Sequence, residues 1–449
     1  MNRKNIGFVE GPILSPLLVF CLPIFVGMVF QTLYNLVDSI IVGQFVSVDA
    51  LAAVGTTAPA ANLMVGMMMG FATGASVTAA QYIGAKQEEK IKPTLSTTMI
   101  FMVTMSIVMI CIALPLAGTI MHWLNVPMNI YADTVTYFRI YVCGLVFMAL
   151  YNFFASFLRA MGDSTTPLIF LIISSLLNVF GDLFFILKMQ MGVAGAALAT
   201  VLAQMISVAL CIVHIRRKIP YFQFAKDEFV FERSLFRNIV RLGLPSGLQA
   251  SIAGVGMLAV QSLINSFGSV SIAAYTAASK MEQISNIIMM SVSQGFAIFV
   301  GQNIGAGKIN RVNQGLKEVI LFAGGVSLAM SLIVYVSGPD LMSLFVSSAD
   351  QQVIDVGAAF MRRWAPFVVL HALQSVVVSV LRGAGDSIFS MISAFTDLFT
   401  RTIMAYVFVR LFGSGFMGIA YSLPCGWLAA CTVSVLRYLS GAWKKKAVV

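Results

Sequence analysis

The chain has 449 residues, of which 59% are hydrophobic and 10% are charged, and its formal net charge is +10. Soluble domains carry about 25% charged residues, so this composition excludes an ordinary soluble enzyme and indicates a protein of the lipid bilayer. The six cysteines have neither CxxC nor metal-ligand spacing, and no ATP-binding, HExxH or supported serine-hydrolase pattern occurs. We therefore expect no enzyme and no cofactor.

Twelve apolar stretches follow one another along the chain, each near or above the roughly 20 residues that a helix needs to cross a hydrocarbon core. They cover residues 14–37, 50–78, 94–121, 131–157, 165–187, 192–214, 237–265, 272–300, 314–338, 356–380, 387–410 and 416–438. The first stretch lacks a small-residue cleavage site, so we expect a retained helix and not a removed signal peptide.

Lysine and arginine residues gather on alternate loops of this pattern. If the N-terminus is cytoplasmic, the opposite side keeps only Lys188 and Arg410. This asymmetry follows the positive-inside rule and predicts a multi-pass protein of the plasma membrane with both termini in the cytoplasm. The basic excess is thus explained by topology, and we expect no nucleic-acid partner.

The two halves of the sequence repeat each other across the hydrophilic stretch in the middle. An offset of 221–223 residues relates three separated pairs of motifs, a regularity that chance rarely produces. The pairs are Leu22-Pro23 with Leu244-Pro245, Gln81–Ala85 with Gln302–Ala306, and Leu158–Ser164 with Leu381–Ser387. We therefore predict an all-α integral membrane fold with twelve transmembrane helices. They form two six-helix bundles related by a pseudo-twofold axis along the membrane normal. The predicted domains are an N-lobe (1–215), a cytoplasmic linker (216–236) and a C-lobe (237–449).

Acidic residues inside the spans mark the candidate site, because an ionisable residue in mid-span costs about 2.5–3.5 kcal/mol on insertion scales. Asp38 continues a polar stripe of the first span, and Asp182 shares a helix face with Asn178 in the fifth. The polar residues of these helices are Gln31, Tyr34, Asn35 and Asp38 in the first, Ser175, Asn178 and Asp182 in the fifth, and Thr200 and Gln204 in the sixth. The repeat-related positions of the second half lack these carboxylates, so we expect a site in one lobe only.

Two carboxylates, an amide and a hydroxyl can hold a hard cation such as Na⁺ through oxygen ligands, or they can share a proton. The set Asp38, Asn178, Asp182 and Thr200 is therefore the predicted cation- or proton-binding site, with Na⁺ as the candidate metal. A buried hydrogen-bond network that only ties the helices together is the structural alternative. The sequence does not choose between the ions.

The second half carries its own ionisable residues. Asp397 and Arg401 stand four residues apart on one predicted helix, which favours a structural ion pair. Lys280 and Glu282 either line a cavity or bind each other. Together with the polar residues of the first half, they form the candidate substrate cavity: Gln31, Tyr34, Asn35, Asn152, Gln204, Lys280, Glu282 and Gln283.

The repeat motifs and the acidic residues together resemble the multidrug and toxic compound extrusion (MATE) family, over essentially the whole chain. The motifs that carry the resemblance are Tyr34–Asp38, Gln81–Lys86, Leu158–Ser164, and Asn178 with Asp182. They are most similar to the DinF-like and MepA-like bacterial branch, which implies a bacterial inner membrane. In that branch the matching positions, here Asp38, Asn178, Asp182 and Thr200, form the cation or proton site. The stretch after Pro245 lacks the glutamate of the NorM-like branch.

The resemblance implies a secondary-active exporter that exchanges amphipathic, cationic organic compounds against H⁺ or Na⁺ by alternating access of the two lobes. Such a protein contacts membrane lipid, and we expect a monomer. The alternative is a lipid-linked saccharide flippase of the same superfamily, for which a broad basic cavity is expected. Arg139, Lys280, Arg362 and Arg363 are the residues that could form one.

Overall fold

The structure, a computed structural model, describes residues 7–223, 228–346 and 350–449. These ranges are almost entirely helical and contain no strand. The helices of the first half are α1 (Leu14–Phe45), α2 (Val48–Gly84), α3 (Ile91–Trp123), α4 (Met128–Cys143), α5 (Leu145–Ala160), α6 (Thr165–Leu183) and α7 (Gly192–Lys218). Those of the second half are α8 (Arg233–Asn265), α9 (Ser269–Gly305), α10 (Ile309–Val336), α11 (Gly338–Ser343), α12 (Gln351–Trp364), α13 (Val368–Gly383), α14 (Ser387–Tyr406) and α15 (Met417–Leu439).

Membrane spans are confirmed in the described part of the chain, where ten helices are long and apolar enough to cross a bilayer. Helices α4 and α5 pass the same test only when taken together, with a bend of 47° at the break between them, and the number of spans is eleven if this bent pair counts as one. Helix α8 occupies the place of the predicted seventh span, and the side chains of residues 252–255 and 257–258 within it lie outside the described part of the structure. The predicted tenth span is also divided, into α12 and α13 with a 3-10 turn between them.

The backbone confirms the internal repeat. Helices α2 and α9 both contain 37 residues. Gly162 and Gly385, which occupy equivalent positions, have φ angles of 86° and 88°, a left-handed conformation that glycine adopts without steric cost. Two π-helical turns, Phe184–Lys188 after α6 and Val407–Leu411 after α14, are also equivalent. Because these are local backbone irregularities, their recurrence shows that the duplication preserved the conformation as well as the sequence motifs.

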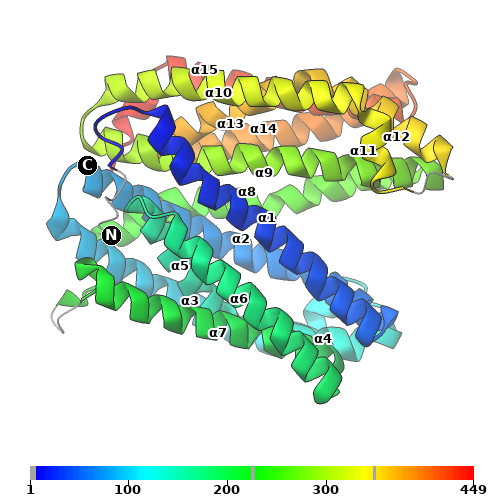
Figure 1. Ribbon diagram of the computed structural model, residues 1–449, viewed down its shortest axis with the longest axis horizontal. Coiled ribbons are helices and arrows are strands. Elements are labelled where there is room, and N and C mark those ends of the chain that lie inside the picture. Colours follow the sequence, from blue (N-terminus) through cyan, green and yellow to red (C-terminus); the bar gives the residue numbers. More distant parts are fainter. Residues whose placement is uncertain (1–6, 224–227, 347–349) are drawn as a thin grey trace. The chain divides into compact units, whose positions relative to one another are not determined.

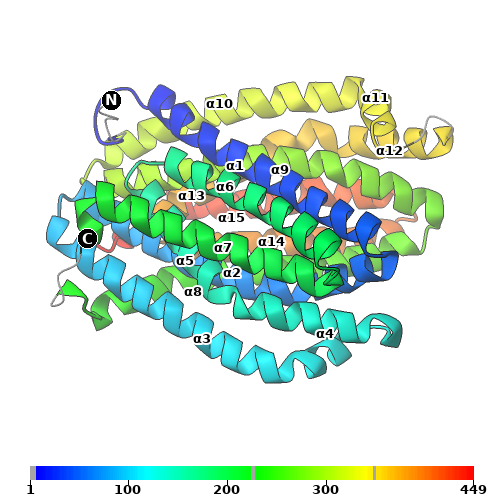
Figure 2. The ribbon, with the colours of Figure 1, turned by 60° about the horizontal axis from the view of Figure 1, so that its bottom comes forward.

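The chain divides into two compact units. Unit 1 is built mainly of Leu22–Ser251, whereas unit 2 combines Phe8–Cys21 with Ile252–Val448. Helices α1 and α8 are thus each shared between the units, because Leu14–Cys21 belongs to unit 2 and Arg233–Ser251 to unit 1. The predicted lobe boundaries at residues 215 and 237 remain a prediction. Within unit 1, α6 lies along α7 (Figures 1 and 2).

The described part of the predicted linker is bound to α3 within unit 1. Lys92 forms an ion pair of 2.7 Å with Glu228. The Ser96 hydroxyl donates to the Val230 carbonyl at 2.7 Å, and the Glu232 backbone N–H donates to the Thr97 hydroxyl at 3.0 Å. These contacts fix the point at which the chain enters α8. Residues 224–227 of the predicted linker lie outside the described residues.

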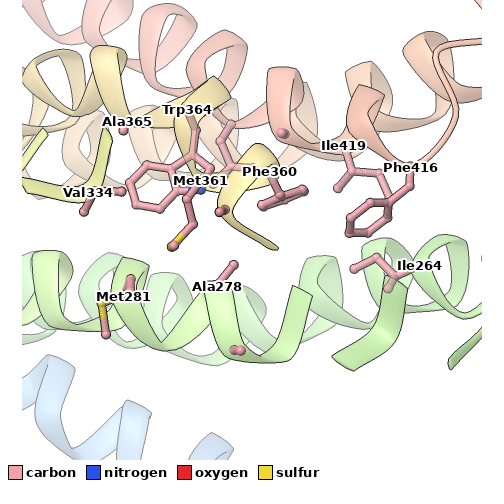
Figure 3. Close-up of a cluster of buried hydrophobic side chains, with 14 of the residues drawn as sticks. Ile264, Ala278, Met281, Val334, Phe360, Met361, Trp364, Ala365, Phe416 and Ile419 are labelled. Atoms are coloured by element: carbon pink, nitrogen blue, oxygen red, sulfur yellow. The ribbon is translucent and has the colours of Figure 1, made fainter. Parts of the chain in front are cut away.

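The core of unit 2 is a layer of apolar side chains between α8 and α9 on one side and α12 and α15 on the other. Figure 3 shows Phe360, Met361 and Trp364 of α12 facing Ala278 and Met281 of α9. The ring of Phe360 stacks on that of Phe416 with a centroid separation of 5.2 Å. Packing of this kind holds helices together inside a bilayer, where the hydrophobic effect gives little drive for association.

Candidate functional site

Three helices of unit 1 bring the predicted cation-site residues together. Asn178 of α6 donates from Nδ2 to the Thr200 hydroxyl of α7 at 3.2 Å. That hydroxyl donates in turn to the Ala196 carbonyl at 3.1 Å, one turn earlier on its own helix. The amide oxygen of Asn178 is therefore left free to face a ligand, and the residue is only 2% exposed. This geometry fixes one amide and one hydroxyl at a shared point between α6 and α7.

Two carboxyl groups complete the site. Asp182 lies one helical turn after Asn178 on α6 and is fully buried, whereas Asp38 of α1 is half-buried. The two side chains are close enough to share a hydrogen bond. Such a bond needs a proton, because two ionised carboxylates have only acceptors to offer each other. The two acids predicted from separate helices thus form one pair.

Apart from the hydrogen bond that a proton shared by the two carboxyl groups makes, three oxygen atoms of this pair have no partner in the described part of the chain. Asp38 Oδ1, both carboxylate oxygens of Asp182 and Asn178 Oδ1 are buried, and no donor in the described part of the chain reaches them. Buried polar atoms in native proteins nearly always have a hydrogen-bond partner, and each exception asks for an explanation. Four converging acceptors are explained if a proton or a cation binds between them.

Tyrosine side chains surround the carboxyl pair; Tyr34 was predicted from the sequence as a cavity residue, whereas Tyr137 and Tyr141 were not. Tyr34 of α1 and Tyr137 of α4 both interact electrostatically with Asp38 and Asp182. Tyr141 stacks on Tyr137 with ring centroids 6.1 Å apart. The signal was present in the sequence, because Tyr137 and Tyr141 stand four residues apart in the predicted fourth span and therefore share a helix face.

An apolar cluster lies next to the site and excludes water from that side. Buried side chains of five segments contribute to it: Ile41 and Val42 of α1, Ala50 of α2, Tyr137 of α4, Ile186 of the π-helical turn, and Val193, Ala196 and Ala197 of α7. Charges interact far more strongly in such surroundings than in water, because the effective dielectric constant is lower. A cation or proton bound here would therefore change the local electrostatics of unit 1 substantially.

The donor set decides which ligands fit. The unpartnered atoms are carboxylate and amide oxygens, with a hydroxyl beside them, and such hard ligands suit Na⁺ or a proton. The described residues contain no group of three or more histidine, cysteine or acidic residues that could hold a metal ion. The site therefore fits a monovalent cation or a proton better than a transition metal.

The other predicted cavity residues of the first half differ in their surroundings. Gln31 and Asn35 are exposed on α1, and Tyr34 is half-buried beside the carboxyl pair. Gln204, one turn after Thr200 on α7, has a buried amide oxygen without a partner among the described residues. Asn152 donates from Nδ2 to the Met148 carbonyl of its own helix at 2.8 Å and does not join the site.

The ionisable residues of the second half form a separate cluster. The predicted pair of Asp397 and Arg401 is confirmed, with 3.4 Å between Oδ2 and Nη2. Glu282 of α9 also binds Arg401, at 3.2 Å, so of the two alternatives for Lys280 and Glu282 the structure does not show the one in which they bind each other. The partner of Glu282 is Arg401 of α14 and not Lys280, because the Arg401 guanidinium lies beside the Glu282 carboxylate inside unit 2. Lys280 and Gln283 are exposed.

Comparison with known proteins gives a consistent result. A family model described as MatE matches residues 23–184 and 245–407, well over half of the chain and once in each half. The probable multidrug resistance protein YoeA of Bacillus subtilis is 26% identical over 438 residues, which are 96% of this chain and 94% of the relative. The multidrug export protein MepA of Staphylococcus aureus is 21% identical over 435 residues, covering 96% and 95% of the two chains.

Solved structures show the same fold. A crystal structure of a MATE protein in complex with MaL6 superposes with a TM-score of 0.91 at 23% identity, covering 99% of this chain and 100% of the other. A MOP superfamily transporter of Pyrococcus furiosus gives a TM-score of 0.89 at 23% identity and covers 99% of both chains. The doubled family match, the full-length relatives and the shared fold agree: the chain belongs to the MatE family of multi-pass membrane transporters.

Proposed function

We propose that this protein is a secondary-active exporter of small organic compounds, driven by H⁺ or Na⁺ that binds at Asp38, Asn178, Asp182 and Thr200. The observation that carries this proposal is the buried carboxyl pair, whose oxygen atoms have no donor among the described residues. Acidic residues buried within a membrane-spanning bundle most often mark ion or proton pathways. The relatives YoeA and MepA, named for multidrug resistance and multidrug export, support small organic molecules as the substrates.

The mechanism follows from the charge of the site. When the carboxyl pair of Asp38 and Asp182 faces the outside, it takes up a cation or proton, and its net charge becomes less negative. Binding of this ion shifts the balance between conformations only if the two states differ in affinity for it, and the same holds for the substrate. We propose that ion binding favours the state that releases substrate outside, and that ion release to the cytoplasm favours the state that binds substrate.

The electrical part of the driving force depends on the charge of the substrate. One elementary charge that moves through 100 mV releases about 2.3 kcal/mol. This free energy supports a substrate gradient of about fifty-fold when one ion is exchanged for one neutral molecule. For a substrate with one positive charge, one-for-one exchange moves no net charge, and the concentration gradient of the ion then has to supply the driving force.

We further propose that the substrates are amphipathic cations and that the protein works as a monomer in the bacterial inner membrane, with both termini cytoplasmic. The distribution of lysine and arginine over the loops supports this orientation. An excess of negative charge at the site supports cationic substrates, because the coupling ion and the substrate then compete for the same electrostatic environment.

The lipid-linked saccharide flippase is the weaker alternative. It needs basic side chains that are free to bind a pyrophosphate. Arg362 instead donates to the Tyr335 carbonyl at 2.9 Å, and Arg363 to the Ala359 carbonyl at 2.6 Å. These bonds engage two of the candidate residues in structural roles, whereas the unpartnered acids of unit 1 would repel an anionic substrate.

The test is transport in proteoliposomes with H⁺ and Na⁺ gradients imposed separately. Asp182→Asn and Asp38→Asn should each abolish ion-dependent efflux while leaving insertion intact, because an amide cannot gain or lose charge. The double variant should be little worse than either single one, since the two groups act as a unit. Asp133→Asn, which changes an exposed acid of α4 in the same unit, is the matched control. Normal ion-driven efflux by either site variant would remove the pair from the mechanism.

A further inference from the structure

A positively charged side chain lies inside unit 2 between two acids. The Arg401 guanidinium is 3.2 Å from Glu282 of α9 and 3.4 Å from Asp397 of its own helix. The three side chains are only 25%, 17% and 21% exposed, so solvent screens them little. The guanidinium also lies 6.0 Å from the ring centroid of Trp427 on α15. Two carboxylates and an aromatic face are the groups that proteins use to recognise an organic cation.

The position of Arg401 within the repeat is informative. With the offset of 223 residues, Arg401 corresponds to Asn178, the amide of the cation site in unit 1. Trp427 corresponds in the same way to Gln204. The duplication has therefore placed a fixed positive charge and an aromatic ring where the first half has an amide and a second polar side chain.

Gly426 of α15 leaves space for the side chains of Asp397 and Arg401. Gly426 precedes Trp427 on α15, and a Cβ atom there would collide with the Asp397 carboxylate and lie 3.2 Å from Arg401 Cβ. Its repeat partner in unit 1 is Ala203, which carries the Cβ atom. A residue without a side chain is thus required at 426 if Asp397 and Arg401 are to pack against α15.

We propose that Arg401 is a tethered cation of unit 2: it stands at the repeat position of Asn178 in the unit 1 site, but its partners Glu282 and Asp397 have no acidic counterpart in unit 1. Glu282, Asp397 and Trp427 form its binding box, and an emptied box would take a small guanidinium or a similar organic cation. The comparison with the unit 1 site rests on the proposed function, but the chemistry of the box does not. Two carboxylates against one guanidinium leave one negative charge, so the box stays selective for cations.

The geometry also ranks the ligands that an emptied box would accept. A guanidinium offers planar, forked N–H donors that match two carboxylates, whereas Na⁺ brings the charge without the fork. A molecule such as methylguanidinium should therefore restore the lost contacts of Arg401→Ala better than Na⁺ at the same concentration. A purely electrostatic effect would instead depend on ionic strength and not on the shape of the cation.

The experiment measures thermal unfolding of the purified full-length protein in detergent, with methylguanidinium or NaCl at matched ionic strength. Arg401→Ala should lower the unfolding midpoint by about 6–15 °C, because it leaves two buried carboxylates without their partner. Millimolar methylguanidinium should restore at least half of this loss with saturable dependence, and NaCl should restore less. The emission of Trp427 should change over the same range, and Trp427→Phe in the Arg401→Ala background should abolish that signal.

Two control variants make the outcome specific. Arg382→Ala removes another arginine of unit 2, from α13, for which no carboxylate lies within ion-pair distance in the described part of the chain. It should not respond to methylguanidinium. The neutral triple variant Glu282→Gln, Asp397→Asn and Arg401→Gln strands no buried charge, so it should fold and should also not respond.

If Arg401→Ala cannot be purified, the double variant Glu282→Gln with Arg401→Ala replaces it, since only one carboxylate is then left without a partner. It should bind methylguanidinium more weakly but still saturably. A folded variant without saturable rescue, or an equal response of Arg382→Ala, would overturn the proposal. Because the readout is binding and not transport, a failure here leaves the proposed function untouched, and a failure of ion-driven efflux leaves the box untouched.

Discussion

The contact between α2 and α8 in unit 1 gives the sharpest test of the packing. A Cβ atom added to Gly74 of α2 would lie 2.6 Å from the Gly243 nitrogen and 2.7 Å from the Ile239 carbonyl oxygen of α8. Ordinary contacts of a Cβ atom begin at 3.4 Å. Because both obstructing atoms belong to the backbone, no rotation of a side chain can relieve the collision. Gly74→Ala must therefore push the two helices apart.

The magnitude follows from these distances. Restoring ordinary contact needs a separation of about 0.7 Å or more, and close-packed interiors transmit such a shift to the neighbouring side chains. Overpacking of this kind lowers the free energy of unfolding by about 1–3 kcal/mol. The better helix propensity of alanine offsets about 0.5–1 kcal/mol of this loss. With backbone on both sides the cost should lie near the upper limit. We expect a net loss of about 2 kcal/mol and a midpoint lowered by about 4–8 °C.

The assay is thermal unfolding in detergent, followed with a thiol-reactive dye that reports exposure of the buried Cys21 and Cys211. Gly325→Ala of α10 is the matched control, because a Cβ atom there meets nothing within 4 Å. Gly295→Ala should be intermediate, since its Cβ atom would meet the side chains of Cys21 and Phe20, which can move. If Gly74→Ala unfolds at the same midpoint as Gly325→Ala, the close approach of α2 and α8 is wrong.

Two further predictions concern charged residues outside the cation site. Asp397→Asn should lower the unfolding midpoint less than Arg401→Gln. In the first variant Glu282 still pairs with Arg401, whereas the second leaves two buried carboxylates without a cationic partner. The reverse order of the two midpoints would contradict the ion pairs of Arg401 with Glu282 and Asp397. The Ser234 hydroxyl holds the pKa of Glu232, in the linker, below its ordinary value. The resulting stabilisation is complete above that ordinary value of about 4.3 and is lost as the pH falls through the lower folded pKa. Hydrogen exchange of residues 228–232 should therefore accelerate beyond the intrinsic pH trend below about pH 4, and Glu232→Gln should remove this dependence.

The apolar spans and the polar faces of single helices could be predicted from the sequence, because both are periodic. The internal repeat supported the division of the spans into two equivalent halves. Hydropathy sums over a window, so it finds a span but does not register a bend within it. For this reason the 47° break at Gly144 and the division of the tenth span were missed.

The site shows the same limit. Asp38, Asn178, Asp182 and Thr200 could be grouped because helical spacing and their cost in a bilayer point to them one helix at a time. The ion pair of Asp397 with Arg401 followed from a spacing of four residues. Glu282 is 119 residues away from Arg401, and no periodic pattern connects them. Contacts between distant helices depend on how the helices pack, which a single sequence does not reveal.

The two units show how one duplication can produce two different electrostatic environments. In unit 1 the repeat position on α6 is an amide, Asn178, which contributes no charge, and on the proposed function the carboxyl pair beside it takes up a proton or cation from outside the chain. At the equivalent position in unit 2 the chain carries Arg401, which pairs with the acids Glu282 and Asp397 of its own unit. A covalently attached charge cannot be exchanged between the two sides of a membrane, whereas a proton or Na⁺ can. On the proposed function, the change from Asn178 to Arg401, together with acids at different positions in the two halves, leaves unit 1 responsive to an ion gradient and gives unit 2 a constant internal charge.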